Sequence, residues 1–173
     1  MAISLYDLSV PTYLQTIGAV GGFLEKGLAY CRECNAEPGE VVEHRLFHDM
    51  APFSFQIRSV AHHSVGAMEA LKSGVFHPPG RGDPLDYAGL QKLVAEARSK
   101  LEALKPDEVN ALEGKDVAFQ FGETKIPFVA ETFLLSFSLP NFHFHATTAY
   151  DILRSRGVPL GKRDYMGRMR IKR

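Results

Sequence analysis

The sequence predicts an all-α fold, a bundle of four long helices with a small β-hairpin before the last helix. Apolar residues recur at steps of three and four along four long stretches, which is the spacing of amphipathic helices. Residues 116 to 128 alternate with a period of two instead, as strands do. Because amphipathic helices bury their apolar stripes against one another, we expect a single helical domain over residues 1–173.

The first helix is expected from residue 3 to about residue 33, where apolar side chains keep helical spacing. Gly18, Gly21 and Gly22 lie inside this stretch and cost up to about 1 kcal/mol each relative to alanine. We therefore expect these glycines where another helix or another chain approaches closely. A turn over residues 36 to 39 is expected to follow, because it contains Pro and Gly.

Cys31 and Cys34 form a CxxC motif at the end of the first helix. A redox pair would be expected in a βαβ context, and the surrounding pattern does not contain one. A zinc site would need a second CxxC, which is missing, although His44 and His48 follow nearby. We therefore expect two reduced cysteines near a helix end.

The second helix is expected from about residue 50 to residue 73, because Gly74 is a typical helix terminator. Asp49 is the expected N-cap. Relative to the apolar stripe of this helix, His62 is predicted to point to solvent, while His63 lies on the flank. Of this histidine pair, only His63 is expected to reach the interior.

The third helix is expected from residue 85 or 86 to about residue 105, because Pro106 ends it. Residues 106 to 113 leave room for one more turn. The alternating residues 116 to 128 form the predicted hairpin, with GETK as its turn. Because a two-stranded hairpin is only marginally stable alone, we expect it to pack on the helices.

The fourth helix is expected from about residue 131 to Gly157, with a kink or break at Pro140. A rotation of about 100° per residue places one set of side chains on its inward face. This predicted face consists of Ser138, Asn141, His145, Thr148, Ala149, Ile152 and Arg156. His143 lies almost opposite His145, so the two do not form a chelating pair. Arg156 on the inward side would need a carboxylate or carbonyl partner.

Composition narrows the class of protein. The chain is 45% hydrophobic and 23% charged, as is usual for soluble globular proteins. Its 20 basic and 20 acidic residues cancel, so we expect no nucleic-acid or membrane partner, although the C-terminal tail is locally basic. There is no apolar run of about 18 residues and no pattern of a secretion signal. We therefore expect a cytoplasmic protein.

Three segments carry a resemblance to a known family. They are MAISLYDLSVPTYLQ, HDMAPFSFQIRSVAHHSVGAMEALKSG and LPNFHFHATTAYDILRSRGVPLGKRDYMG. The chain resembles an uncharacterised bacterial domain-of-unknown-function branch of the DinB/YfiT-like superfamily. The resemblance implies an up-down-down-up four-helix bundle, often a homodimer. It also implies a divalent metal held by one histidine of helix two and an HxxxH pair of helix four. Some relatives are thiol-dependent transferases or isomerases.

The chain departs from this pattern in its ligand positions. The second histidine of the HxxxH pair matches His145, but the first matches Asn141, which is a poor ligand for zinc or nickel. On helix two the match is either Gln56 or His63. The candidate metal ligands are therefore His63 and His145, which would hold zinc or nickel weakly. Gln56, Asn141 and Thr148 are the expected lining of the pocket.

Two functions fit these residues, and the sequence leaves open whether the protein is an enzyme. The favoured hypothesis is a small-molecule-binding or oligomeric scaffold with a degenerate metal site. In it, His145 is satisfied by Asn141, Thr148 or a backbone carbonyl. The alternative is a metal-dependent, thiol-transferase-like enzyme that uses His145 and His63, assisted by Asn141 or Gln56. The GKRDYMG segment is expected to cap the bundle or form a dimer contact.

Overall fold

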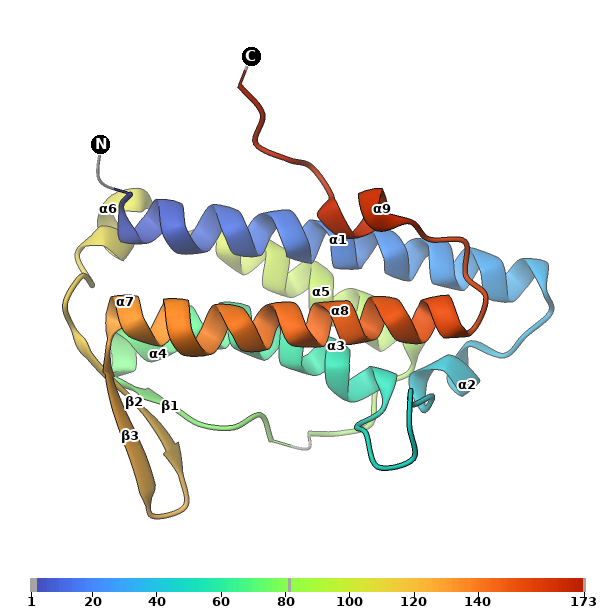
Figure 1. Ribbon diagram of the computed structural model, residues 1–173, viewed down its shortest axis with the longest axis horizontal. Coiled ribbons are helices and arrows are strands. Elements are labelled where there is room, and N and C mark those ends of the chain that lie inside the picture. The colour runs from blue at the N-terminus through green and yellow to red at the C-terminus, as the bar shows by residue number, and fades with distance from the viewer. Residues whose placement is uncertain (1–2, 81, 173) are drawn as a thin grey trace.

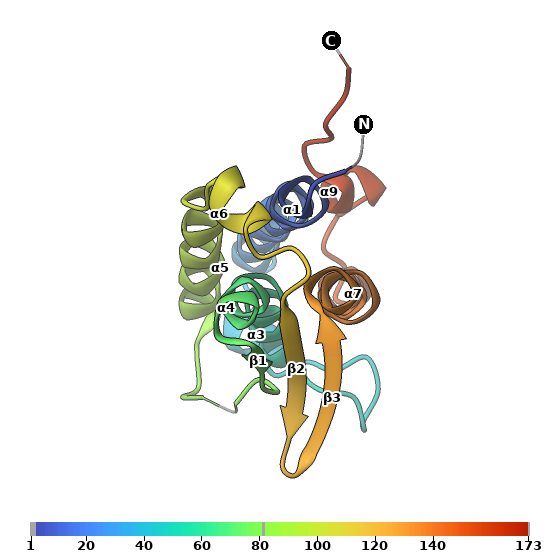
Figure 2. The same cartoon turned by 90° about the vertical axis from the view of Figure 1, so that its left-hand side faces the viewer.

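The computed structural model describes residues 3–80 and 82–172, and it is mostly helical with a small three-stranded sheet (Figure 1). The prediction of a mainly helical protein is confirmed. Four helical segments run side by side and share one apolar core, as the end-on view in Figure 2 shows. They are α1 (Leu5–Glu33), α3 to α4 (Phe53–Ser73), α5 (Tyr87–Glu102) and α7 to α8 (Ala130–Ser155).

Helix α1 spans most of the length of the molecule. It begins after Ser4, whose hydroxyl accepts a hydrogen bond from the Asp7 amide at 3.1 Å, an N-cap contact. Its buried stripe includes Tyr13, Ile17 and Val20, none of which has measurable exposed area. The short helix α2 (Pro38–Val42) follows, in part of the region where a turn was expected.

The second helical segment consists of α3 (Phe53–Ala61), the π-helical turn η1 (His62–Gly66) and α4 (Ala67–Ser73). Its N-cap is Pro52, in an extended conformation, so the expectation that Asp49 caps this helix was wrong. Its C-cap is Gly74, whose φ of 83° favours glycine.

Helix α5 begins after Asp86, whose carboxylate accepts from the Gly89 amide at 2.7 Å. Helix α6 (Pro106–Asn110) is a single further turn. The sheet follows, with strands β2 (Asp116–Phe121) and β3 (Thr124–Val129) pairing antiparallel. The two-residue strand β1 (Val75–Phe76) adds in parallel to β2, a pairing too short to leave a period in the sequence.

The last helical segment contains a second π-helical turn. It consists of α7 (Ala130–Phe133), η2 (Leu134–Ser138) and α8 (Leu139–Ser155). Pro140 lies in the first turn of α8, directly after η2. Proline has no amide hydrogen and its ring clashes with the carbonyl four residues earlier, so a wider turn just before it relieves both problems without a break.

The predicted inward face is confirmed at Ser138, Thr148, Ala149 and Ile152, which are buried, and differs at its other residues. A π-helical turn holds more residues than an α-helical turn, so residues after it are rotated relative to a count along a straight α-helix. The fully buried stripe of α8 is Phe142, Ala146, Ala149, Ile152 and Leu153. Asn141 and His145 lie half-buried on its flank, and Arg156 is exposed rather than inward. In the described part of the chain, none of the helices combines the length and apolar character needed to cross a bilayer.

A prediction concerns the contact between α1 and α5. A Cβ added at Gly27 would lie 2.4 Å from the Tyr87 hydroxyl, which donates to the Leu24 carbonyl at 2.8 Å. We expect Gly27→Ala to lower the free energy of unfolding by about 1–3 kcal/mol, because the buried tyrosine ring has no room to move. Gly39→Ala is the control, since an added Cβ there meets nothing within 4 Å. Urea denaturation measures both, and equal stabilities of the two variants would contradict the contact.

Candidate functional site

The half-buried imidazole of His145 on α8 is held by Gln56 on α3. His145 Nδ1 and Gln56 Oε1 are 2.7 Å apart, and Gln56 Nε2 donates to the Ala51 carbonyl at 3.0 Å. The second bond fixes the orientation of the amide, so its oxygen faces the imidazole and can only accept. His145 therefore carries its proton on Nδ1, and Nε2 has a free lone pair.

Aromatic rings surround His145. Phe55 and Phe144 meet it edge to face, with ring centroids 5.8 and 5.3 Å away. Burial among these rings lowers the pKa of His145 to about 4, because the charged form loses its hydration. The side chain is therefore neutral at physiological pH and presents an acceptor in an apolar setting.

His63 lies next to His145 and is almost fully buried, with 5% of its surface exposed. The two rings stack with centroids 5.7 Å apart and planes 19° from parallel. Among the residues that the structure describes, His63 Nδ1 has no hydrogen-bond partner. Burial, with smaller contributions from the neighbouring His145 and His62, lowers the pKa of His63 to about 3. The two histidines predicted as candidate ligands, His63 and His145, thus lie next to each other.

Two buried hydrogen bonds of the Ser138 hydroxyl, here called the Ser138 relay, hold the backbone of His63; the sequence did not predict them. The Ser138 hydroxyl donates to the His63 carbonyl at 2.6 Å. It is also 2.8 Å from the Tyr13 hydroxyl, which must therefore be the donor in that pair. The relay joins α1, η1 and η2, and burial raises the pKa of Tyr13. Ser138 stood on the predicted inward face, but nothing in the sequence indicated which carbonyl it would reach.

The other pocket residues do not join the pair. Asn141 Nδ2 donates to the Phe137 carbonyl at 2.7 Å, and the Thr148 hydroxyl donates to the Phe144 carbonyl at 2.8 Å. Both bonds are local to their own helical segment. The expectation that Asn141, Thr148 or a backbone carbonyl satisfies His145 was therefore wrong, because the side chain of Gln56 holds Nδ1 instead.

His62 also differs from its prediction, because it does not point freely to solvent. It is half-buried against the Phe76 ring, with centroids 4.5 Å apart. Its Nε2 lies 2.7 Å from the carbonyl of His77, to which it donates. The reason is the unpredicted strand β1, which brings residues 75 to 77 back across the helix. Burial lowers the pKa of His62.

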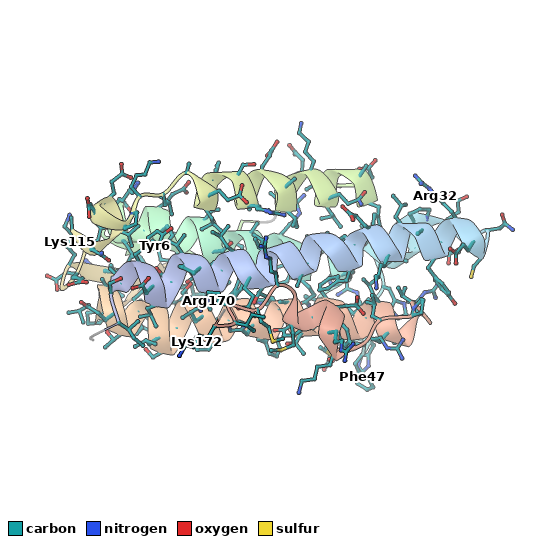
Figure 3. All side chains as sticks on the ribbon, turned by 90° about the horizontal axis from the view of Figure 1, so that it is seen from above. Tyr6, Arg32, Phe47, Lys115, Arg170 and Lys172 are labelled. Carbon is teal, nitrogen blue, oxygen red and sulfur yellow. The ribbon has the colours of Figure 1, made fainter. Side chains whose placement is uncertain are left out.

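The C-terminal segment lies across the outside of α1 (Figure 3). Helix α9 (Lys162–Met166) is fixed by an ion pair between Lys26 and Asp164 at 2.6 Å. Arg170 continues over α1, where its guanidinium is 3.4 Å from the Thr12 hydroxyl. Arg173, part of the basic tail, lies outside the described residues. Arg156 has the carboxylate partner that was expected, Glu40 at 3.0 Å, but on the surface.

The donor set does not fit a tightly bound metal. Two imidazoles that share a zinc ion place their centres roughly 5–6 Å apart, given Zn–N distances near 2.0–2.1 Å. The separation of His63 and His145 matches this. However, within residues 3–80 and 82–172 there is no group of three or more His, Cys, Asp or Glu side chains that could hold a metal ion. Two nitrogens alone bind a transition metal weakly.

Comparison with known proteins identifies a family and a solved structure of similar fold. A family described as a domain of unknown function, DUF1993, matches residues 5–166 of the chain. A crystal structure of a DinB family member protein from Shewanella denitrificans is similar with a TM-score of 0.82. The identity is 22%, over 98% of this chain and 95% of that chain, so the likeness concerns the fold. No curated protein matches the chain.

A prediction follows from the low pKa values. Unfolded histidine titrates near pH 6.5, so between about pH 6.5 and pH 4 the unfolded chain binds more protons than the native one. Stability is therefore complete above this window and is lost as the pH falls through it. Replacing His145 by Ala removes one such group, and we expect the slope of unfolding free energy against pH to fall by up to about 1.4 kcal/mol per pH unit.

Chemical denaturation at a series of pH values measures this slope. His48→Ala is the control, because His48 is exposed on the surface. The loss of the Gln56 contact shifts the stability of His145→Ala at every pH equally, so only the slope reports the titration. An unchanged slope would show that His145 is not desolvated in the native state.

Proposed function

Because the chain belongs to the DUF1993 family and has a DinB-like fold, we propose that it is a small-molecule-binding or oligomeric scaffold with a degenerate metal site. We take the bundle as up-down-down-up, with the β2–β3 hairpin placed before the last helix. The proposed ligand is a largely apolar molecule with one hydrogen-bond donor. Its donor would bind the Nε2 lone pair of His145.

The observation that carries this proposal is the contact between Gln56 and His145. Ligand sites in proteins are mostly apolar, with a few polar groups in fixed orientations. An imidazole whose proton is held on Nδ1 presents such a group, an acceptor of fixed direction on a ring that Phe55 and Phe144 contact edge to face. A ligand that donates to Nε2 would not have to reorient the Gln56 amide or the imidazole, because the amide is already held by the Ala51 carbonyl.

The same pKa argues against His145 as a general base. Acid–base catalysis is most effective when the pKa of the catalytic group is near the working pH. Burial holds the pKa of His145 at about 4, so its neutral form is a weak base at neutral pH. The geometry therefore supports binding more than proton transfer.

The oligomeric part of the proposal concerns α1. Among the described residues, a Cβ added at Gly18 or Gly22 would meet no atom within 4 Å beyond the neighbouring backbone of α1 itself. Packing within the chain therefore does not require glycine at either position, although both weaken the helix. We propose that this side of α1 receives a second copy of the chain in a homodimer. A single monomeric species in sedimentation velocity would refute this part.

Binding to the aromatic site is tested with a library of small aromatic fragments that carry a hydroxyl or amide donor. Nuclear magnetic resonance of the chain with isotope-labelled histidine reports the Nε2 signal of His145. We expect binding fragments to shift this signal, and His145→Ala to weaken their binding by about tenfold, the effect of one lost hydrogen bond. His143→Ala is the control, because His143 lies on the other side of α8 near the Tyr165 hydroxyl. Equal binding by both variants would contradict the proposal.

A metal-dependent, thiol-transferase-like enzyme is the second candidate, favoured by the unpartnered Nδ1 of His63 and its spacing from His145. The scaffold proposal predicts zinc and nickel well below one ion per chain in protein purified without an affinity tag. It also predicts the same content in His145→Ala. Near-stoichiometric metal that is lost in His145→Ala would support the enzyme instead. Elemental analysis measures the content, and the thermal shift on adding zinc gives an independent reading through linkage.

A further inference from the structure

The CxxC motif ends α1 in a defined local structure. Asn35 has a φ of 52°, the left-handed conformation of the residue that follows a helix end. The Ala36 amide donates to the Cys31 carbonyl at 2.8 Å, and the Asn35 amide donates to the Arg32 carbonyl at 3.3 Å. These two bonds form a Schellman motif, so the last turn of the helix is intact up to Cys34.

The intact turn places the two cysteines within reach of one another. An α-helix separates the Cα atoms of residues i and i+3 by about 5 Å. Disulfides join residues whose Cα atoms are about 4.4–6.8 Å apart. The Cβ atoms of such a helical pair are about 5–6 Å apart, somewhat more than a disulfide allows. Closing the bond therefore needs a small adjustment of Cys34, which is at the free end of the helix.

The two thiols differ sharply in access. Both are free, but Cys34 is exposed, whereas Cys31 has only 3% of its surface exposed. Burial raises the pKa of the Cys31 thiol, and the Arg156 guanidinium opposes this increase. An exogenous reagent can therefore reach Cys34 directly, while Cys31 reacts only with a group delivered next to it.

We propose that Cys31 and Cys34 form a reversible redox site, with Cys34 as the entry thiol and Cys31 as the resolving thiol. The oxidant is a low-molecular-weight disulfide, RSSR. The Cys34 thiolate attacks one sulfur of RSSR, forms a mixed disulfide and releases one thiolate, RS⁻. Cys31 then loses its proton and attacks the Cys34 sulfur, and the second RS⁻ leaves. The chain loses two electrons and two protons, and RSSR is reduced to two RSH.

The site is placed to affect the junction of α1 with α8. The neighbouring Cys34 thiol raises the pKa of Tyr30. The Tyr30 hydroxyl lies where a Cβ of Gly157, just past the end of α8, would be 2.7 Å away. A bond from Cys34 to Cys31 turns the thiol away from Tyr30. Because the helical geometry strains this bond, we expect it to be easily reduced, as regulatory disulfides are.

The experiment exposes the full chain to excess oxidised glutathione at pH 8 under non-denaturing conditions and follows intact mass. The wild type is expected to pass through a glutathione adduct and end as a species lacking two hydrogen atoms, which dithiothreitol restores. Cys31→Ser is expected to stop at the adduct. Cys34→Ser is the matched control, in which the buried Cys31 should react at least about tenfold more slowly than Cys34.

Three outcomes would overturn the proposal. The wild type could stop at the adduct, which would show that the helical pair does not close. Cys34→Ser could react as fast as the wild type, which would show that Cys34 is not the entry thiol. A disulfide-linked dimer as the main product would assign Cys34 to a contact between chains. Circular dichroism of each variant before oxidation confirms that it is folded.

Discussion

The hydroxyl of Ser138 connects the two helical segments that carry the candidate site. It donates to the carbonyl of His63 in η1 and accepts from the Tyr13 hydroxyl of α1. Both π-helical turns therefore meet at buried hydroxyl groups whose hydrogen bonds are satisfied. Leaving one such buried polar group without a partner would cost about 1–3 kcal/mol of stability. The bond to its carbonyl fixes the position of the His63 backbone along α8. The stacking of the His63 ring on His145 depends on this position. π-Helical turns are rare and, where they interrupt α-helices, are frequently found at functional sites.

Desolvation determines the chemistry of the stacked pair. Two imidazoles in contact cannot both be charged without repulsion, and the surrounding phenylalanine rings give neither charge any hydration. Neutral imidazoles can stack, accept hydrogen bonds and coordinate metals, but the low pKa values of His63 and His145 make these two poor proton acceptors. Gln56 then selects one tautomer of His145, because its own amide is already bound to the Ala51 carbonyl. His145 is therefore a neutral imidazole whose acceptor is Nε2.

The sequence predicted the positions of the long helices and the residues of the site better than their mutual contacts. Helical periodicity identified His63, His145 and Gln56 as inward or flanking, because burial of one face leaves a period. It could not identify the pairing of Gln56 with His145, which depends on the approach of two helices distant in sequence. The π-helical turns were invisible to a count of 100° per residue. Arg156 was misplaced because it follows the last residue of α8 as its C-cap, where the helical count no longer applies. His62 was misplaced because a two-residue strand, β1, leaves no pattern.

The two amide side chains near His145 form different kinds of hydrogen bond. Asn141 stands where the resemblance places a first histidine, and its amide is turned to the Phe137 carbonyl of its own segment. Gln56, one helix away, binds the Nδ1 side of His145 and so leaves Nε2 open. Asn141 is therefore bonded within its own helical segment, whereas Gln56 holds His145 from the neighbouring helix. The orientation of the His145 ring thus depends on the approach of α3 to α8, the two helices that this bond joins.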